Sequence, residues 1–97
     1  MPYNLPLPRK LGQLWKVKIL DNEPLYEEPH VTIRRKDERM WRYGLRRHGL
    51  LDSCPDPDEV PGEVLDEIEA NIDEICQQWD ARFPTNPVAG EEYDDGN

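Results

Sequence analysis

The chain has 97 residues, 10 of them proline, and it carries 12 Lys and Arg against 21 Asp and Glu, for a formal net charge of −9 at pH 7. This length allows one small domain. No run of about 18 apolar residues is present, which excludes a membrane-spanning helix, and the proline-rich, charged N-terminus predicts no signal peptide. Two cysteines, Cys54 and Cys76, then indicate free thiols in a reducing, cytoplasmic compartment.

The N-terminal segment, residues 1–12, contains Pro2, Pro6 and Pro8. Proline fixes φ and lacks a backbone N–H, so we expect a flexible, extended arm here.

Strict alternation of apolar and polar residues predicts the first strand, over residues 14–20. Two further strands follow, one opening after Pro29 and one over residues 40–46, and the polar residues 36–39 between them have hairpin length. Asp21 to Pro24 predicts a turn. Short links favour an antiparallel meander. The side chains expected to face a core are Trp15, Val17, Ile19, Val31, Ile33, Trp41, Tyr43 and Leu45.

The apolar period changes to 3.6 residues in the C-terminal half, which predicts a long amphipathic helix. Asp58 or Glu59 is suited to cap it, Pro61 suits its first turn and Pro84 ends it. Its apolar stripe consists of Val64, Leu65, Ile68, Ile72, Ile75, Cys76, Trp79 and Phe83. Residues 84–97 contain few apolar residues and end in a run of acids, so we expect a disordered acidic tail.

The predicted fold class is therefore α+β. One domain over residues 13–83 combines a three-stranded antiparallel sheet with one long C-terminal helix, between disordered termini.

Charge is divided unequally along the chain. Residues 1–48 hold 11 Lys and Arg against 6 Asp and Glu, net +5, whereas residues 49–97 hold one base against 15 acids, net −14. On the sheet, the alternation predicts an open cationic face made of Lys16, Lys18, His30, Arg34, Lys36, Arg42 and Arg46. On the helix, an acidic face is expected from Glu63, Asp66, Glu67, Asp73 and Glu74.

Two functions are consistent with these faces. A small non-enzymatic protein that binds another protein, with a homodimer included, would use charge complementarity. A nucleic-acid-binding protein would use the cationic face to contact phosphates. Trp15, Trp41 and Tyr43 have the parity of the core, which argues against a base-stacking surface. The acidic tail or the acidic helix of a second copy is a further expected occupant of the cationic face.

Catalytic and metal-binding patterns carry little signal. The cysteines and histidines lack zinc-ligand spacing, and the acids between Asp52 and Glu59 lack the glycine of a calcium loop, so no metal or other cofactor is predicted. His30 acting as a base beside Arg34 or Arg46 would suffice for RNA cleavage, but no feature of the sequence selects that reaction.

A resemblance to a known family rests on the run Glu28-Pro29-His30-Val31-Thr32-Ile33. It resembles the strand motif, approximately Pro-Pro-His-x-His-Val, of a family of small bacterial proteins of unknown function that are often found beside toxin–antitoxin-like partners. The resemblance covers residues 15–83 and implies a small prokaryotic protein, with a phage protein equally compatible. The alternative to a protein-binding function is then a nucleic-acid-associated, toxin–antitoxin-like component that binds RNA or DNA through the cationic sheet face. Glu28 replaces the first proline and Thr32 replaces the second histidine, so a role that needs both histidines does not transfer to this chain.

Overall fold

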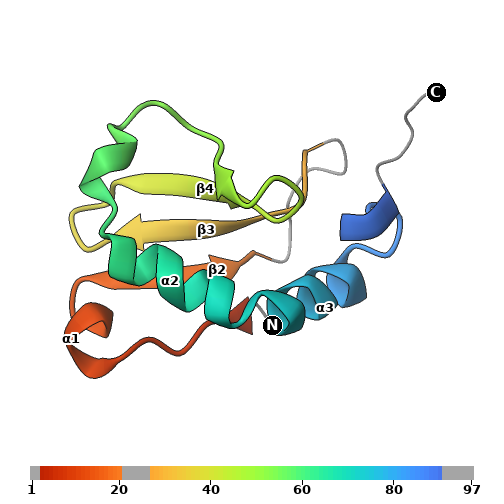
Figure 1. The fold of residues 1–97 in the computed structure, drawn as a ribbon, viewed down its shortest axis with the longest axis horizontal. Coiled ribbons are helices and arrows are strands. Elements are labelled where there is room, and N and C mark those ends of the chain that lie inside the picture. Colours follow the sequence, from red (N-terminus) through yellow and green to blue (C-terminus); the bar gives the residue numbers. More distant parts are fainter. Residues whose placement is uncertain (1–2, 21–26, 91–97) are drawn as a thin grey trace.

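The computed structural model describes residues 3–20 and 27–90. The predicted turn from Asp21 to Pro24 and the acids of residues 91–97 lie outside the described residues. The chain forms an antiparallel sheet and, after it, two helices that pack on one face of that sheet (Figure 1).

The sheet has five strands in the order β1-β2-β3-β4-β5. The three predicted strands are present as β2 (Trp15–Ile19), β3 (His30–Arg35) and β4 (Met40–Gly44). Two short strands that were not predicted extend the sheet, β1 (Tyr3–Asn4) beside β2 and β5 (Gly49–Leu50) beside β4. A two-residue strand shows no alternation to detect, which is why the sequence pattern missed both.

Burial in β2 and β4 confirms the predicted parity. Trp15, Val17 and Ile19 are buried while Lys16 is exposed, and Trp41 and Tyr43 are buried on β4. β3 differs, because its first four residues are all buried. At this end of the strand the His30 ring lies against Trp79 of α3, with 5.5 Å between the ring centroids, so burial does not alternate there.

The predicted long helix is two helices, α2 (Gly62–Ala70) and α3 (Ile72–Arg82), preceded by the 3-10 turn η1 (Pro57–Glu59). Asn71 separates them with φ −119° and ψ 20°. Its side-chain nitrogen donates a hydrogen bond of 2.8 Å to the carbonyl of Glu67. Asparagine competes in this way for backbone groups and is therefore favoured at helix ends. The apolar period continues across the break, so the pattern alone did not show it.

The core lies between the sheet and the helices. The fully buried side chains include Trp41 on β4 and Trp79 on α3, and those of Val64, Ile68 and Ile75 fill the space between. The Trp41 indole nitrogen donates to the carbonyls of Pro55 and Asp56, at 3.1 and 3.2 Å, so the ring also holds the loop before η1.

The N-terminal segment that was expected to be a flexible arm is held against the sheet from Tyr3 onward. Tyr3 pairs with Ile19, and the Leu5 N–H donates to the Val17 carbonyl at 2.8 Å. Leu5 is buried, and the short helix α1 (Arg9–Gly12) follows. Burial of Leu5 and pairing to β2 override the proline content, because the prolines lie beside and not within the paired residues.

The first part of the segment expected to be a disordered tail is likewise bound to the domain. Residues 84–90, which we call the C-terminal clasp, contain the 3-10 turn η2 (Val88–Gly90). Asn86 accepts a hydrogen bond of 2.7 Å on its carbonyl from the Trp79 indole, and its side-chain nitrogen donates one of 2.7 Å to the Glu27 carbonyl. The Val88 N–H donates to Asp80 at 2.8 Å.

No helix in the described part of the chain is both long enough and apolar enough to cross a membrane.

Candidate charged interface

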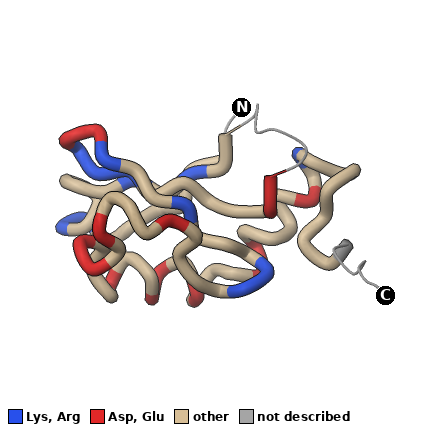
Figure 2. The backbone as a smooth tube through the Cα atoms, turned by 90° about the horizontal axis from the view of Figure 1, so that it is seen from above, with Lys and Arg blue, Asp and Glu red and all other residues tan. Residues whose placement is uncertain are grey.

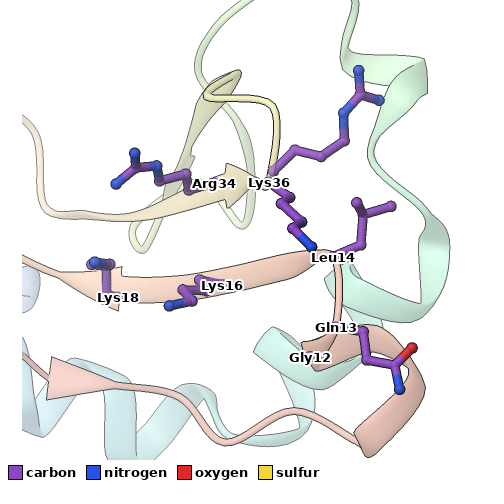
Figure 3. A pocket seen from close by; sticks show the side chains of 8 residues that line it. Gly12, Gln13, Leu14, Lys16, Lys18, Arg34 and Lys36 are labelled. Carbon is purple, nitrogen blue, oxygen red and sulfur yellow. The ribbon is translucent and has the colours of Figure 1, made fainter.

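The sheet face opposite α2 and α3 carries four neighbouring basic residues. Lys16 on β2 lies directly opposite Arg34 on β3, and Lys18 is two residues further along β2. Lys36 follows the end of β3, and its N–H donates to the Leu14 carbonyl at 2.9 Å, which continues the strand pairing. We call Lys16, Lys18, Arg34 and Lys36 the cationic face; Figure 3 shows Lys16 and Lys18 on one strand, Arg34 on the neighbouring strand and Lys36 at its end.

A shallow hollow of about 320 Å³ opens on this face. Its lining consists of Gly12, Gln13, Leu14, Lys16, Lys18, Arg34, Arg35 and Lys36. Two large apolar side chains accompany the charges, since Leu14 is 47% exposed and Met40 is 52% exposed. Met40 lies opposite Arg34 on β4, so one row across the sheet reads Lys16, Arg34, Met40. The sequence analysis assigned neither Leu14 nor Met40 to this face, although Met40 has the same strand parity as Arg42.

The lysines of the cationic face differ from its one arginine in their pairing. Within residues 3–20 and 27–90, Lys16, Lys18 and Lys36 form no ion pair, whereas Arg34 pairs with Glu38. Unpaired lysines keep their full charge available to a ligand.

Arg42 has the predicted parity but is already engaged. Its guanidinium contacts Asp52 at 2.7 Å and Glu27 at 3.4 Å, and its backbone N–H also donates to Asp52, at 2.9 Å. Hydrogen bonding by Arg42 holds the pKa of Asp52 below its usual value. Arg42 thus lies beside the cationic face, and its ion pairs with Asp52 and Glu27 belong to the fold.

The structure places His30 and Arg46 away from the cationic face. His30 is 1% exposed, its ring lies 5.5 Å from the Trp79 ring between centroids, and its Nδ1 lies 2.7 Å from the Glu28 carbonyl oxygen. Arg46 donates to the clasp carbonyls of Val88 and Pro87, at 2.9 and 2.8 Å. Strand alternation had put both outside the core. Trp79 of α3 covers His30 and the clasp covers Arg46, and strand parity predicts neither contact.

Arg35 and Arg39 form a separate network at the β3–β4 turn. Arg35 donates to Asp37 at 2.8 and 3.1 Å, both arginines contact Glu59, and the Arg35 guanidinium lies 5.8 Å from the centroid of the Trp15 ring. The hydrogen bonds from Arg35 lower the pKa of Asp37 to about 2. Figure 2 shows acids and bases interleaved in the fold, although the two halves of the sequence have net charges of opposite sign.

The predicted acidic face is divided between the two helices by the break at Asn71. Glu63, Asp66 and Glu67 lie on α2, and Asp73 and Glu74 on α3. Of these five, Glu74 accepts a hydrogen bond of 3.3 Å from the Tyr3 hydroxyl. The rest form no ion pair among the described residues, and a cluster of solvated acids is by itself no binding site.

A second polar cluster joins β4 to α2. The Tyr43 hydroxyl donates to Glu69, and His48 Nδ1 lies 3.0 Å from both Glu69 oxygens. Burial, and then the hydrogen bond and charge of Glu69, raise the pKa of Tyr43 far above its usual value. His48 has a left-handed backbone, φ 55°, at the end of the β4–β5 turn. The cluster therefore fastens this turn to α2.

The remaining candidates for chemistry are unpromising. Burial and the nearby carboxylates raise the pKa of the Cys76 thiol, and a protonated thiol is a poor nucleophile. In the part of the chain that the structure describes, no three His, Cys, Asp or Glu side chains gather as a metal site would require.

No protein-family model, curated protein or solved structure matches this chain in the comparisons made with it. The resemblance carried by residues 28–33 thus stays a prediction.

Proposed function

We propose that this chain is a small non-enzymatic binding protein whose cationic face recognises an acidic segment of another protein. The observation that carries the proposal is the row Lys16, Arg34, Met40 on the sheet face that the helices leave uncovered, with the neighbouring Lys18 and Lys36, which form no ion pair with the described residues. Charges without internal partners are not needed to hold the fold.

Exposed apolar side chains beside these charges favour a polypeptide ligand. Leu14 lines the hollow and Met40 lies opposite Arg34 on β4, so both offer apolar contact beside the charges. Interfaces between proteins combine apolar and polar contacts, and methionine is enriched in them. An acidic peptide with apolar residues between its carboxylates matches this pattern.

A nucleic-acid ligand is the second candidate, and the structure supports it less. Proteins that bind single strands stack bases on exposed aromatic rings, yet Trp15, Trp41 and Tyr43 are all at most 5% exposed. We retain nucleic acid as an outcome of the test below.

The proposal extends to a cytoplasmic, prokaryotic or phage origin. Cys54 and Cys76 are free thiols, which suits a reducing compartment. Pro29 and His30, which carry the family resemblance, are both buried. We infer that these residues of the motif serve the fold.

Charge reversal on the cationic face tests the proposal. The probe is a fluorescently labelled peptide of alternating glutamate and leucine, titrated with wild type, with Lys16→Glu/Lys18→Glu and with the control Arg9→Glu/Lys10→Glu. Both double variants change the net charge by the same amount, and the control residues lie on α1, outside the lining of the hollow. A surface ion pair contributes up to about 1 kcal/mol, so reversal of two lysines weakens binding roughly tenfold.

We expect binding to weaken as sodium chloride rises from about 50 to 500 mM, and we expect the control variant to bind like wild type. Equal loss in both double variants, or no binding by wild type at low salt, would overturn the proposal. Single-stranded RNA and duplex DNA are titrated in parallel. Tighter binding of either nucleic acid than of the peptide, abolished by Lys16→Glu/Lys18→Glu, would replace the proposed partner with a nucleic acid.

A further inference from the structure

Two acids stand side by side in the β3–β4 turn, and they are held very differently. Asp37 accepts two side-chain hydrogen bonds from Arg35 and a backbone one of 3.4 Å from Arg39. The Glu38 carboxylate pairs with Arg34 alone among the described residues, and the Glu38 side chain is 75% exposed while that of Arg34 is 39% exposed. The Glu38 carboxylate is therefore easily released, whereas Asp37 is part of the turn.

The backbone of Glu38 shows that a glutamate is not what the turn itself requires. Its φ is 78°, and the turn is closed by hydrogen bonds from Glu38 N–H to the Arg35 carbonyl, at 2.9 Å, and from Arg35 N–H to the Arg39 carbonyl, at 2.8 Å. This left-handed position of a hairpin turn favours glycine, because a Cβ is strained there. The side chain present instead lies on the one arginine of the cationic face.

We propose that Glu38 is an internal competitor, which holds the place on Arg34 that a carboxylate of the ligand takes on binding. This inference rests on the proposed function and names the group that the face recognises. Guanidinium groups pair with carboxylates through parallel N–H···O bonds, so a ligand carboxylate satisfies Arg34 as Glu38 does.

Competition makes the face selective for ligands with several carboxylates. The first ligand carboxylate only replaces Glu38, and the exchange brings little gain. Further carboxylates meet Lys16, which lies opposite Arg34, and Lys36, neither of which has an ion pair within the described ranges. A ligand with one carboxylate thus binds poorly, and one with several, spaced as on an extended strand, binds well.

Neutralising Glu38 tests the inference. The same glutamate–leucine peptide is titrated with wild type, Glu38→Gln, Glu38→Gly and the control Glu63→Gln. Glu63 is an exposed carboxylate on α2, so its variant makes the same change in net charge on the helix side. Loss of one exposed ion pair with Arg34 corresponds to about a two- to fivefold gain in affinity for both Glu38 variants, with Glu63→Gln close to wild type.

A second measurement follows the displaced group directly. In NMR spectra of wild type, we expect the peptide to shift the Arg34 Nε–Hε signal and to move the Glu38 carboxyl carbon toward its value in the free amino acid. If wild type binds the peptide but the Glu38 variants bind no more tightly than Glu63→Gln, the competitor is refuted and the proposed function stands. If neither wild type nor the Glu38 variants bind it, both are refuted.

Discussion

We predict that the C-terminal clasp stabilises the fold, although residues 84–90 were expected to be disordered. Asn86→Ala removes the donor to the Glu27 carbonyl, at 2.7 Å, and the weaker acceptor for Arg46, at 3.3 Å. A partly buried carbonyl left without its partner, together with the lost hydrogen bond, lowers the free energy of unfolding by about 2 kcal/mol. For a chain of this length that corresponds to a fall in Tm of roughly 8 to 16 °C.

Urea and thermal denaturation of Asn86→Ala measure this loss, with Thr85→Ala as the control. Thr85 is exposed and precedes Asn86 in the chain, and its side chain forms no hydrogen bond with the described residues. Hydrogen exchange at the Trp79 indole N–H, which donates to the Asn86 carbonyl, reports opening of the clasp itself. A difference of less than about 0.5 kcal/mol between the two variants would refute the reasoning, since surface substitutions alone vary by that amount.

Two further predictions concern pH. Burial and Glu69 raise the pKa of Tyr43 above its ordinary value of 10.0, so the neutral phenol stabilises the fold in full below pH 10 and this contribution is lost as the pH rises further. Absorbance at 295 nm should show that this phenol ionises only when the protein unfolds. The Tyr43→Phe variant should lose less stability than wild type as the pH rises above 10. Hydrogen bonding by Arg42 lowers the pKa of Asp52 from 3.8, so the pair stabilises the fold above that pH and is lost as the pH falls through the folded value. Asp52→Asn should therefore be less stable than wild type at pH 7, and urea titrations should show the difference shrink toward pH 2; a constant difference contradicts the assigned role.

The strand predictions show what alternation can establish. The parity of Trp15, Val17 and Ile19 against Lys16 was confirmed because β2 has one covered face and one open face along its whole length. In β3 the same reasoning predicted that His30 is exposed on the open face, but the structure buries it against Trp79. Parity assigns a side chain to a face of the sheet, but it contains no information about what a distant segment places on that face.

The candidate site was predicted in part for the same reason. Lys16, Lys18, Arg34 and Lys36 come together because they lie on two strands joined by register, which the hairpin signal already implied. Arg46 was assigned to the same surface from its charge, and only the fold shows that clasp carbonyls surround its guanidinium. A charged residue looks the same in a sequence whether its partner is water or a residue 40 positions away.

What the sequence alone determined is local: the three central strands, the helical stripe and the concentration of bases in the first half of the chain. These follow from periodicity and composition, which each segment carries independently of the others. Tertiary structure alone decided the edge strands, the clasp and which lysines of the cationic face form no ion pair among the described residues. Those features depend on hydrogen bonds and burial between segments far apart in the chain, and the free energy of such contacts exists only once the fold has brought the segments together.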